Sequence, residues 1–140
     1  MNTTAPIRPG ALHRHCVLLT AGPAAAAEAR GRVRAAICTW DVRVDVDVAI
    51  LLTSELVTNA IREETGETVM LAIACCQDEL RVDVHDTSCS LPVPVRAAPV
   101  GDGAYEEAGR GLVLVESLSD EWGWYQTPSG KAVYFRLRFG

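Results

Sequence analysis

The stretch that decides the fold is Leu51-Leu52-Thr53-Ser54-Glu55-Leu56-Val57-Thr58-Asn59-Ala60, where a carboxylate and an amide interrupt an apolar helical pattern. At about 100° per residue, one apolar stripe forms from Val48, Leu51, Leu52 and Leu56. Glu55 and Asn59, four residues apart, project from the middle of it. Because burying a carboxylate without a partner is costly, we expect a site that holds a metal, a ligand or ordered water. A helix face turned toward solvent at this point is the open alternative.

The composition indicates one globular domain. The chain has 140 residues, of which 49% are hydrophobic and 22% are charged, against roughly 150 residues for a typical domain. Residues 1–10 contain two prolines and no apolar period, which predicts a flexible leader. We therefore expect a single domain over residues 11–140.

Charge and hydropathy argue against several partners. The net charge of −5 and the scattered arginines leave no basic stripe, so no direct nucleic-acid contact is expected. No run approaches the ~18 apolar residues of a membrane helix, and the start lacks a secretion signal. These features predict a cytoplasmic protein without a membrane partner. The five cysteines have no Cys-x-x-Cys spacing, so we expect reduced, mostly buried thiols and no zinc site.

The remaining periodicities predict alternating strands and helices. Strands are expected at residues 13–20, 69–76, 80–86, 122–127 and 132–139, the last four as two hairpins. Helices are expected from Pro23 to about Trp40, from about Asp47 to about Glu64, and over residues 112–119.

Two polar features flank segment 87–108, which is rich in glycine and proline. This segment is longer than the ~12–15 residues that compact domains usually leave irregular, and such a loop is typical of a lid. Before it, Asp86 continues the inward alternation of Leu80, Val82 and Val84. After it, Gly109-Arg110-Gly111 is expected to open the helix at residues 112–119. Singly, a glycine pair at a helix start is more often a turn and cap, and a strand-ending aspartate more often serves the next turn.

Together these groups could form a nucleotide site. Free backbone N–H groups at a glycine-containing helix start can approach phosphate oxygens. The side-chain oxygen of Asn59 suits magnesium, and Glu55, one helical turn away, can orient or deprotonate a hydroxyl. Asp86 can accept a hydrogen bond from an exocyclic amine such as that of adenine.

The same residues resemble the motifs of the GHKL ATP-binding family. Residues 55–60 (Glu-Leu-Val-Thr-Asn-Ala) resemble its N-box, residues 82–86 (Val-Asp-Val-His-Asp) its G1 box, and residues 109–115 (Gly-Arg-Gly-Leu-Val-Leu-Val) its G2 box. The resemblance covers nearly the whole chain after the leader. The small size makes the chain look like the anti-sigma-factor serine/threonine kinases of the RsbW and SpoIIAB type, especially short actinobacterial members.

The resemblance implies an α/β fold of the Bergerat type, an α+β two-layer sandwich with a mixed, mainly antiparallel sheet and helices on one face. By position, Asn59 would ligate Mg2+, Glu55 would act as base and Asp86 would bind the adenine amine of ATP. Gly109 and Gly111 would bracket the phosphates, with Arg110 and Leu112 beside them; Arg110 could reach a phosphate or only cover the helix start.

The implied function is that of an anti-sigma factor and serine/threonine kinase that phosphorylates a STAS-domain anti-sigma-factor antagonist. A sigma factor is the other implied partner, and a homodimer is possible by analogy. The sequence departs from the family pattern at Thr87-Ser88, where glycines are usual, and at Lys131-Ala132, where a threonine often supports adenine. The alternative is therefore a degenerate, non-catalytic member that acts as a protein-interaction module with weak or no nucleotide binding.

Overall fold

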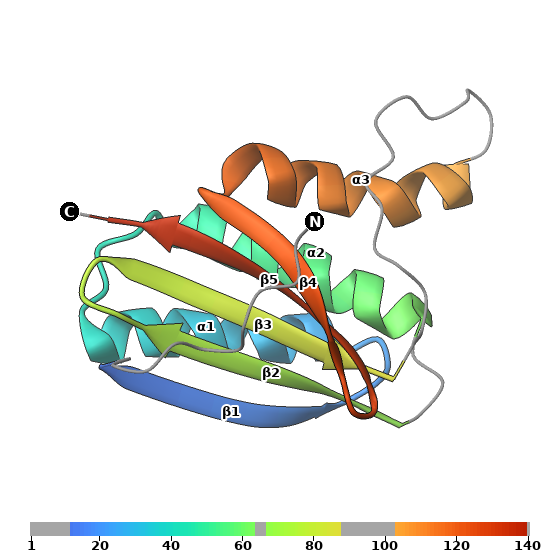
Figure 1. Cartoon of the computed structure of the whole chain (residues 1–140), viewed down its shortest axis with the longest axis horizontal. Coiled ribbons are helices and arrows are strands. Elements are labelled where there is room, and N and C mark those ends of the chain that lie inside the picture. The colour runs from blue at the N-terminus through green and yellow to red at the C-terminus, as the bar shows by residue number, and fades with distance from the viewer. Residues whose placement is uncertain (1–11, 64–66, 88–102, 140) are drawn as a thin grey trace.

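The computed structural model describes residues 12–63, 67–87 and 103–139. The elements in these ranges are β1 (His13–Thr20), α1 (Ala25–Trp40), α2 (Val46–Glu63), β2 (Thr68–Cys75), β3 (Glu79–Asp86), α3 (Gly103–Leu118), β4 (Glu121–Thr127) and β5 (Gly130–Arg138) (Figure 1). The leader predicted at 1–10 lies outside the described residues, and so does the greater part of the predicted lid, residues 88–102.

The strands form one sheet in the order β1-β2-β3-β5-β4, and every pairing in it is antiparallel. The expectation of a mixed sheet is therefore wrong for the described strands. A single crossover helix would return the chain parallel to its starting strand. Here two helices, α1 and α2, separate β1 from β2, and the additional reversal between the helices makes these neighbouring strands antiparallel.

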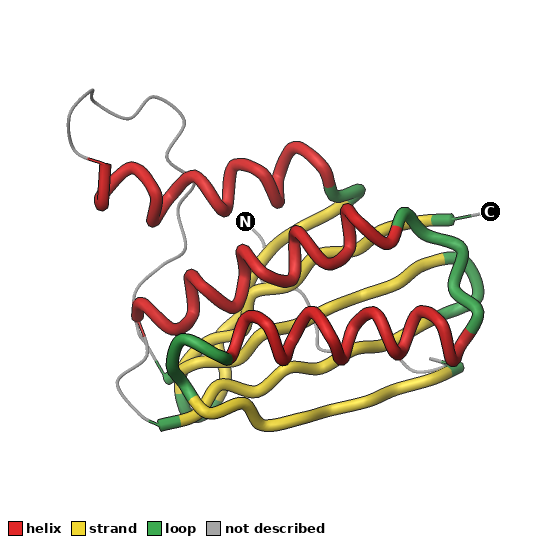
Figure 2. Tube along the Cα trace, turned by 180° about the vertical axis from the view of Figure 1, so that it is seen from behind, coloured by secondary structure: helices red, strands yellow, loops and turns green. Residues whose placement is uncertain are grey.

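The helices and the sheet form two layers. Figure 2 shows α1 and α2 side by side over one face of the sheet, with α3 beyond α2. Buried apolar side chains fill the space between the layers, including Leu19, Leu52, Leu56, Leu71, Ile73, Leu80, Val82 and Phe135. The buried face of α1 carries small residues such as Ala25, Ala29 and Ala36, which allow the helix to lie close to its neighbours. The predicted α+β two-layer sandwich of the Bergerat type is confirmed.

The buried face of α2 is rotated from the predicted stripe. Leu51 is 39% exposed, whereas Ala49, Leu52, Leu56 and Ala60 are buried. These four positions follow one another at intervals of three or four residues, so they define the core-facing line of the helix and Leu51 falls at its edge. The burial of the polar residues of α2 therefore follows from this rotated face and not from the predicted stripe.

Two smaller expectations also change. Cys16 and Cys38 are exposed, so the described cysteines are not mostly buried, although Cys75 is. Cys16 lies among the outward positions of an edge strand and Cys38 on the outer side of α1, where the helical and strand periods place them. Among the described helices, none combines the length and the low polarity that a bilayer crossing needs.

Candidate functional site

The polar residues of α2 divide into structural and candidate functional groups. The hydroxyl of Thr53 donates to the carbonyl of Ala49 at 2.8 Å, one turn back in the same helix. Ser54 accepts a hydrogen bond from Arg30 at 3.0 Å, which ties α2 to α1. These contacts account for two of the polar side chains in the decisive stretch. Glu55 and Asn59 remain as candidates.

Asn59 and Glu55 lie on α2 one turn apart. Asn59 is only 8% exposed, and its neighbour Ala60 belongs to the core. Glu55 is half-buried and faces α3: a Cβ added at Gly111 would lie 2.7 Å from its carboxylate oxygen Oε1. The glycine at position 111 therefore leaves room for the Glu55 carboxylate between the two helices. The predicted solvent-facing alternative does not apply to Asn59.

The glycine-containing motif does not open a helix. α3 begins at Gly103, so Gly109, Arg110 and Gly111 lie inside it, and the prediction that they open this helix is wrong. The physical reason is the segment Ala104-Tyr105-Glu106-Glu107-Ala108, whose alanines and glutamates favour a helix. The place of this motif beside the phosphates stays a prediction. Leu112 is buried in the core. Gly111 therefore allows α3 to approach Glu55 closely, and it does not cap a helix.

Asp86 ends β3 on the helix-facing side of the sheet, as its alternation with Val82 and Val84 predicted. Directly across the ladder, β5 places Lys131 opposite it. The Lys131 ammonium Nζ lies 3.1 Å from Asp86 Oδ1, and the two side chains are 3% and 1% exposed. The group expected to receive an adenine amine is thus held in a buried ion pair, which the sequence reasoning missed. The ion pair depends on the register of β3 and β5, which the local sequence pattern does not specify.

Gly130 fixes the end of β3 from the side of the closing hairpin. A Cβ at this position would overlap the Asp86 carbonyl oxygen and lie 2.6 Å from the Cα of Thr87. Only a residue without a side chain can approach the backbone this closely. The turn between β4 and β5 therefore sets where Asp86 and Lys131 meet.

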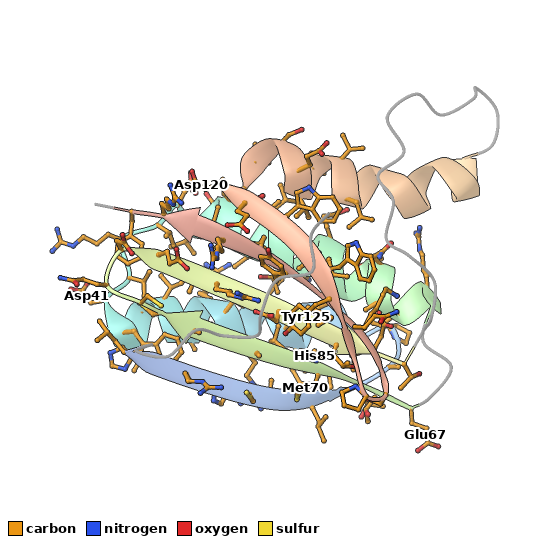
Figure 3. All side chains as sticks on the ribbon, viewed as in Figure 1. Asp41, Glu67, Met70, His85, Asp120 and Tyr125 are labelled. Carbon is orange, nitrogen blue, oxygen red and sulfur yellow. The ribbon has the colours of Figure 1, made fainter. Side chains whose placement is uncertain are left out.

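A second cluster of charges lies on the sheet face that no described helix covers. Arg81 donates to both carboxylate oxygens of Asp83, from Nε at 2.8 Å and from Nη2 at 3.0 Å. The Tyr125 hydroxyl donates to Asp83 Oδ2 at 2.8 Å, and the Arg81 guanidinium lies 4.1 Å from the centre of the Tyr134 ring. Figure 3 shows Tyr125 beside His85 on this face. No functional role had been predicted for these residues.

Burial and Asp83 shift the titration of this cluster. Burial raises the pKa of Tyr125, and the Asp83 charge adds to the effect. Burial alone would lower the pKa of Arg81. The hydrogen bond to Asp83 and the charge of Asp83 outweigh the effect of burial, so the pKa of Arg81 is raised. Burial lowers the pKa of His85. These shifts favour the neutral forms of Tyr125 and His85 and the charged form of Arg81.

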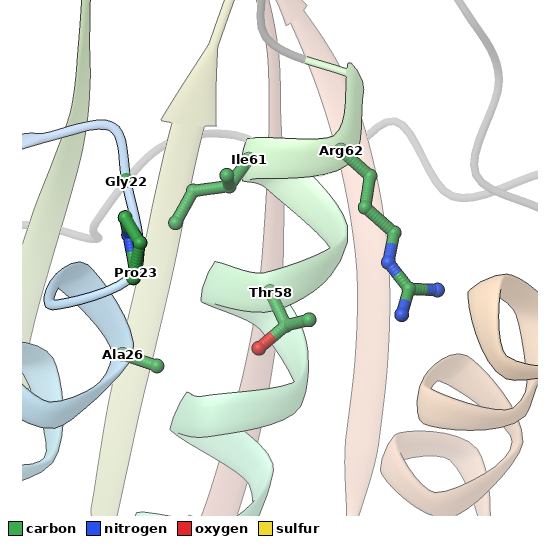
Figure 4. Close-up of a pocket in the computed structure, with 6 residues that line it drawn as sticks. All are labelled: Gly22, Pro23, Ala26, Thr58, Ile61 and Arg62. Atoms are coloured by element: carbon green, nitrogen blue, oxygen red, sulfur yellow. The ribbon is translucent and has the colours of Figure 1, made fainter.

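A cavity of about 400 Å³ lies between the start of α1 and the end of α2 (Figure 4). Gly22, Pro23, Ala26, Thr58 and Ile61 line it together with Arg62, whose side chain leaves α2 on the side opposite Ile61. None of the predicted site residues lines this cavity, and its wall is mainly apolar. The nucleotide site predicted at Glu55, Asn59 and Asp86 is therefore separate from this cavity and stays a prediction.

The residues fit part of a magnesium–nucleotide site. The described residues contain no group of three or more His, Cys, Asp or Glu side chains that could hold a metal ion. Asn59 would therefore supply one oxygen, and phosphate oxygens and water would complete the shell, which is how magnesium is usually bound beside nucleotides. Asp86 is less suited than Asn59 to bind a metal ion, because the Lys131 ammonium group already contacts its carboxylate.

Comparison with known proteins identifies the family of the chain. No curated protein matches the chain. The family model of the histidine kinase-like ATPase domain matches residues 19–137, which include β2, β3 and the helices that carry Glu55, Asn59 and Gly111. The match covers far more than half of the chain. The protein therefore belongs to the histidine kinase-like ATPase domain family, the GHKL-type ATPases.

Proposed function

We propose that this protein is an ATP-dependent serine/threonine kinase and anti-sigma factor that phosphorylates a STAS-domain anti-sigma-factor antagonist. The observation that carries the proposal is the Glu55 carboxylate, held beside Gly111 and one helical turn from the buried Asn59. Family membership supports ATP as the nucleotide, typically with Mg2+. The residue pattern around Glu55 supports the kinase subtype.

In this role each residue has a separate task. Asn59 would bind Mg2+, which when bound offsets the charge of the phosphate oxygens. Glu55 would accept the proton of a serine or threonine hydroxyl as that oxygen attacks the γ-phosphorus of ATP, while the bond from this phosphorus to the bridging oxygen breaks and ADP leaves. A phosphorylated antagonist gains about −1.5 to −2 charge, which disrupts a tight interface through repulsion and desolvation. The phosphorylated antagonist would then dissociate from the protein. The protein, as a monomer or a homodimer, would then be able to bind a sigma factor in the cytoplasm.

The test is phosphoryl transfer from γ-labelled ATP to a purified STAS-domain antagonist in the presence of Mg2+. Glu55→Gln should lower the rate by about 10²- to 10⁴-fold, the usual contribution of a positioned base. Glu67→Gln, an exposed carboxylate at the start of β2, is the matched control and should leave the rate unchanged. Equal rates for Glu55→Gln and the unmodified protein would contradict the assignment of the base.

A second candidate function is that of a non-catalytic interaction module. The observation in its favour is the Asp86–Lys131 pair, which occupies an oxygen of the carboxylate expected to receive the base. A module of this kind would bind its sigma factor equally well with and without nucleotide. Binding of the sigma factor that does not respond to ATP, together with no transfer to the antagonist, would favour this candidate over the kinase.

A further inference from the structure

The two helices that flank the Glu55 carboxylate expose three leucines. Leu51 lies on α2, and Leu114 and Leu118 lie on α3. Their side chains are 39%, 38% and 43% exposed, and they are three of the five large apolar side chains that are exposed in the described ranges. Exposed apolar residues that gather in one place mark interaction sites, whereas single scattered ones do not. We call Leu51, Leu114 and Leu118 the leucine patch.

The fold brings the leucine patch to one side of Glu55. Figure 1 shows α3 running antiparallel to α2, and a Cβ added at Gly111 would lie 2.7 Å from Glu55 Oε1 and 3.3 Å from the Glu55 Cβ. Residues after Gly111 therefore run beside residues before Glu55. Leu114 and Leu118 follow Gly111 at helical spacings of three and seven residues, on or beside the face of α3 that meets α2. Leu51 precedes Glu55 by one helical turn, so the patch borders the carboxylate on this side.

Helix α2 presents three kinds of side chain in succession. Leu51, Glu55 and Asn59 follow one another at intervals of four residues, so each lies about 40° around the helix axis from the one before it. Along this line the side chains pass from exposed at Leu51, through half-buried at Glu55, to buried at Asn59. If Asn59 holds the magnesium and the phosphates, as the proposed function requires, the acceptor hydroxyl reaches Glu55 from the exposed end of the line. The protein segment that carries this hydroxyl then covers the leucine patch.

We propose that the leucine patch binds the antagonist beside the residue that becomes phosphorylated, through an apolar side chain about two residues from the acceptor serine or threonine. One helical turn separates Leu51 from Glu55, which is a rise of about 6 Å. An extended segment covers this length in about two residues, at about 3.3 Å each. The inference rests on the proposed function, because it requires that Glu55 face the acceptor hydroxyl. It makes the leucine patch a determinant of substrate specificity.

The test is the steady-state kinetics of phosphoryl transfer from ATP to a purified STAS-domain antagonist, with Leu51→Gln and Leu114→Gln each made in the full chain. Glutamine is about as favourable as leucine in a helix, so both variants should fold. We expect KM for the antagonist to rise about 10-fold in each variant, because each loses an apolar contact to the substrate. kcat and the dissociation constant for ATP should stay within about 2-fold, because the lost contact is made equally in the ground state and the transition state.

Leu18→Gln is the matched control. Leu18 is 66% exposed on the edge strand β1, and it alternates with the buried Leu19, so it lies on the sheet face that no described helix covers. Its change should leave KM and kcat unchanged. A KM within about 2-fold of that of the unmodified protein in both folded helix variants would overturn the inference, and so would an equal rise in Leu18→Gln. Loss of sigma-factor binding or a lower molecular mass in solution, with KM unchanged, would assign the patch to the sigma factor or to a second copy of the chain and would overturn it as well.

The outcomes also separate the inference from the proposed function. If the unmodified protein transfers the phosphoryl group and Glu55→Gln slows the transfer, but neither leucine variant raises KM, the inference fails and the proposed function stands. If the unmodified protein transfers no phosphoryl group to the antagonist, the proposed function fails and the inference fails with it.

Discussion

Strand β3 carries two buried aspartates on opposite faces of the sheet, and their surroundings differ. Asp83 receives the guanidinium of Arg81 through two donors and the hydroxyl of Tyr125 through a third. Asp86, at the strand end, receives the ammonium of Lys131 at 3.1 Å. A guanidinium presents a rigid fork that holds a carboxylate in one geometry, whereas an ammonium is a point charge on a flexible stem.

The difference separates a structural carboxylate from a candidate binding carboxylate. Three donors from its neighbours occupy most of the roughly four acceptor sites of the Asp83 carboxylate, so this residue has little capacity left for a ligand. Asp86 faces the helix layer that contains Asn59, and its lysine partner can reorient its donors. We therefore expect changes around Asp83 to act on stability alone, and changes around Asp86 to act on stability and on nucleotide binding.

The largest loss of stability is expected for Arg81→Met. Removal of one partner from a buried pair leaves an uncompensated charge on Asp83 and should lower the free energy of unfolding by about 3–5 kcal/mol, measured by urea denaturation. Arg81→Met combined with Asp83→Leu removes both charges and should recover most of this loss. A loss below about 1 kcal/mol for the single change would mean that the pair is not a structural element.

Gly130→Ala should have the next largest effect. The new Cβ would overlap the Asp86 carbonyl and crowd the Cα of Thr87, and such overpacking costs about 1–3 kcal/mol. Gly31→Ala is the control, because nothing lies within 4 Å of a Cβ there and alanine in a helix gains about 0.5–1 kcal/mol over glycine. Denaturation of both variants checks the prediction. Equal stability of the two would show that the hairpin turn does not fix the end of β3.

A smaller effect is expected from the titration of His85. Because burial lowers its pKa in the folded protein, the neutral form is favoured on folding. Its stabilising contribution is complete above the unfolded pKa of about 6.5 and is lost as the pH falls through the lower, folded value. His85→Gln should therefore lose less stability than the unmodified protein when denaturation is repeated at falling pH. Parallel pH profiles would show that His85 is not held neutral.

The smallest change in stability is expected for Gly111→Ala. Its Cβ would meet the Glu55 carboxylate oxygen at 2.7 Å, which rotation of that side chain relieves, and the Glu55 Cβ at 3.3 Å, which requires only a small shift. The helical gain of alanine over glycine offsets part of this adjustment. Displacement of the Glu55 carboxylate should nevertheless lower the rate of phosphoryl transfer by about 10-fold or more. The measurement pairs denaturation with the transfer assay. Unchanged transfer would mean that Glu55 does not act from this position.

The regular elements could be predicted from the sequence because local periodicity determines them. The alternation in β3 and β5 and the helical period in α1 place much of the core, and Asp86 lies where its alternation predicted. The start of α3 was missed, because the glycines and prolines before it masked the helix-forming residues 104–108.

Pairing across the sheet could not be predicted from local pattern. The Asp86–Lys131 contact joins residues 45 positions apart, and the Tyr125–Asp83 contact joins residues 42 apart. Both depend on the register of β3 and on the strand order, which local pattern does not specify. The motif residues Glu55 and Asn59 were found because a polar pair in an apolar helix is visible in the sequence itself. Their roles remain predictions.

The central claim, that Asn59 and its neighbours form a magnesium-dependent nucleotide site, is tested most directly by calorimetry. ATP is titrated into the unmodified protein and into Asn59→Ala, first with Mg2+ and then with excess chelator. We predict binding by the unmodified protein that weakens on chelation, and a folded Asn59→Ala protein in which this magnesium dependence is lost. Equal affinity of both proteins for ATP in magnesium, or no binding in either buffer, would contradict the claim.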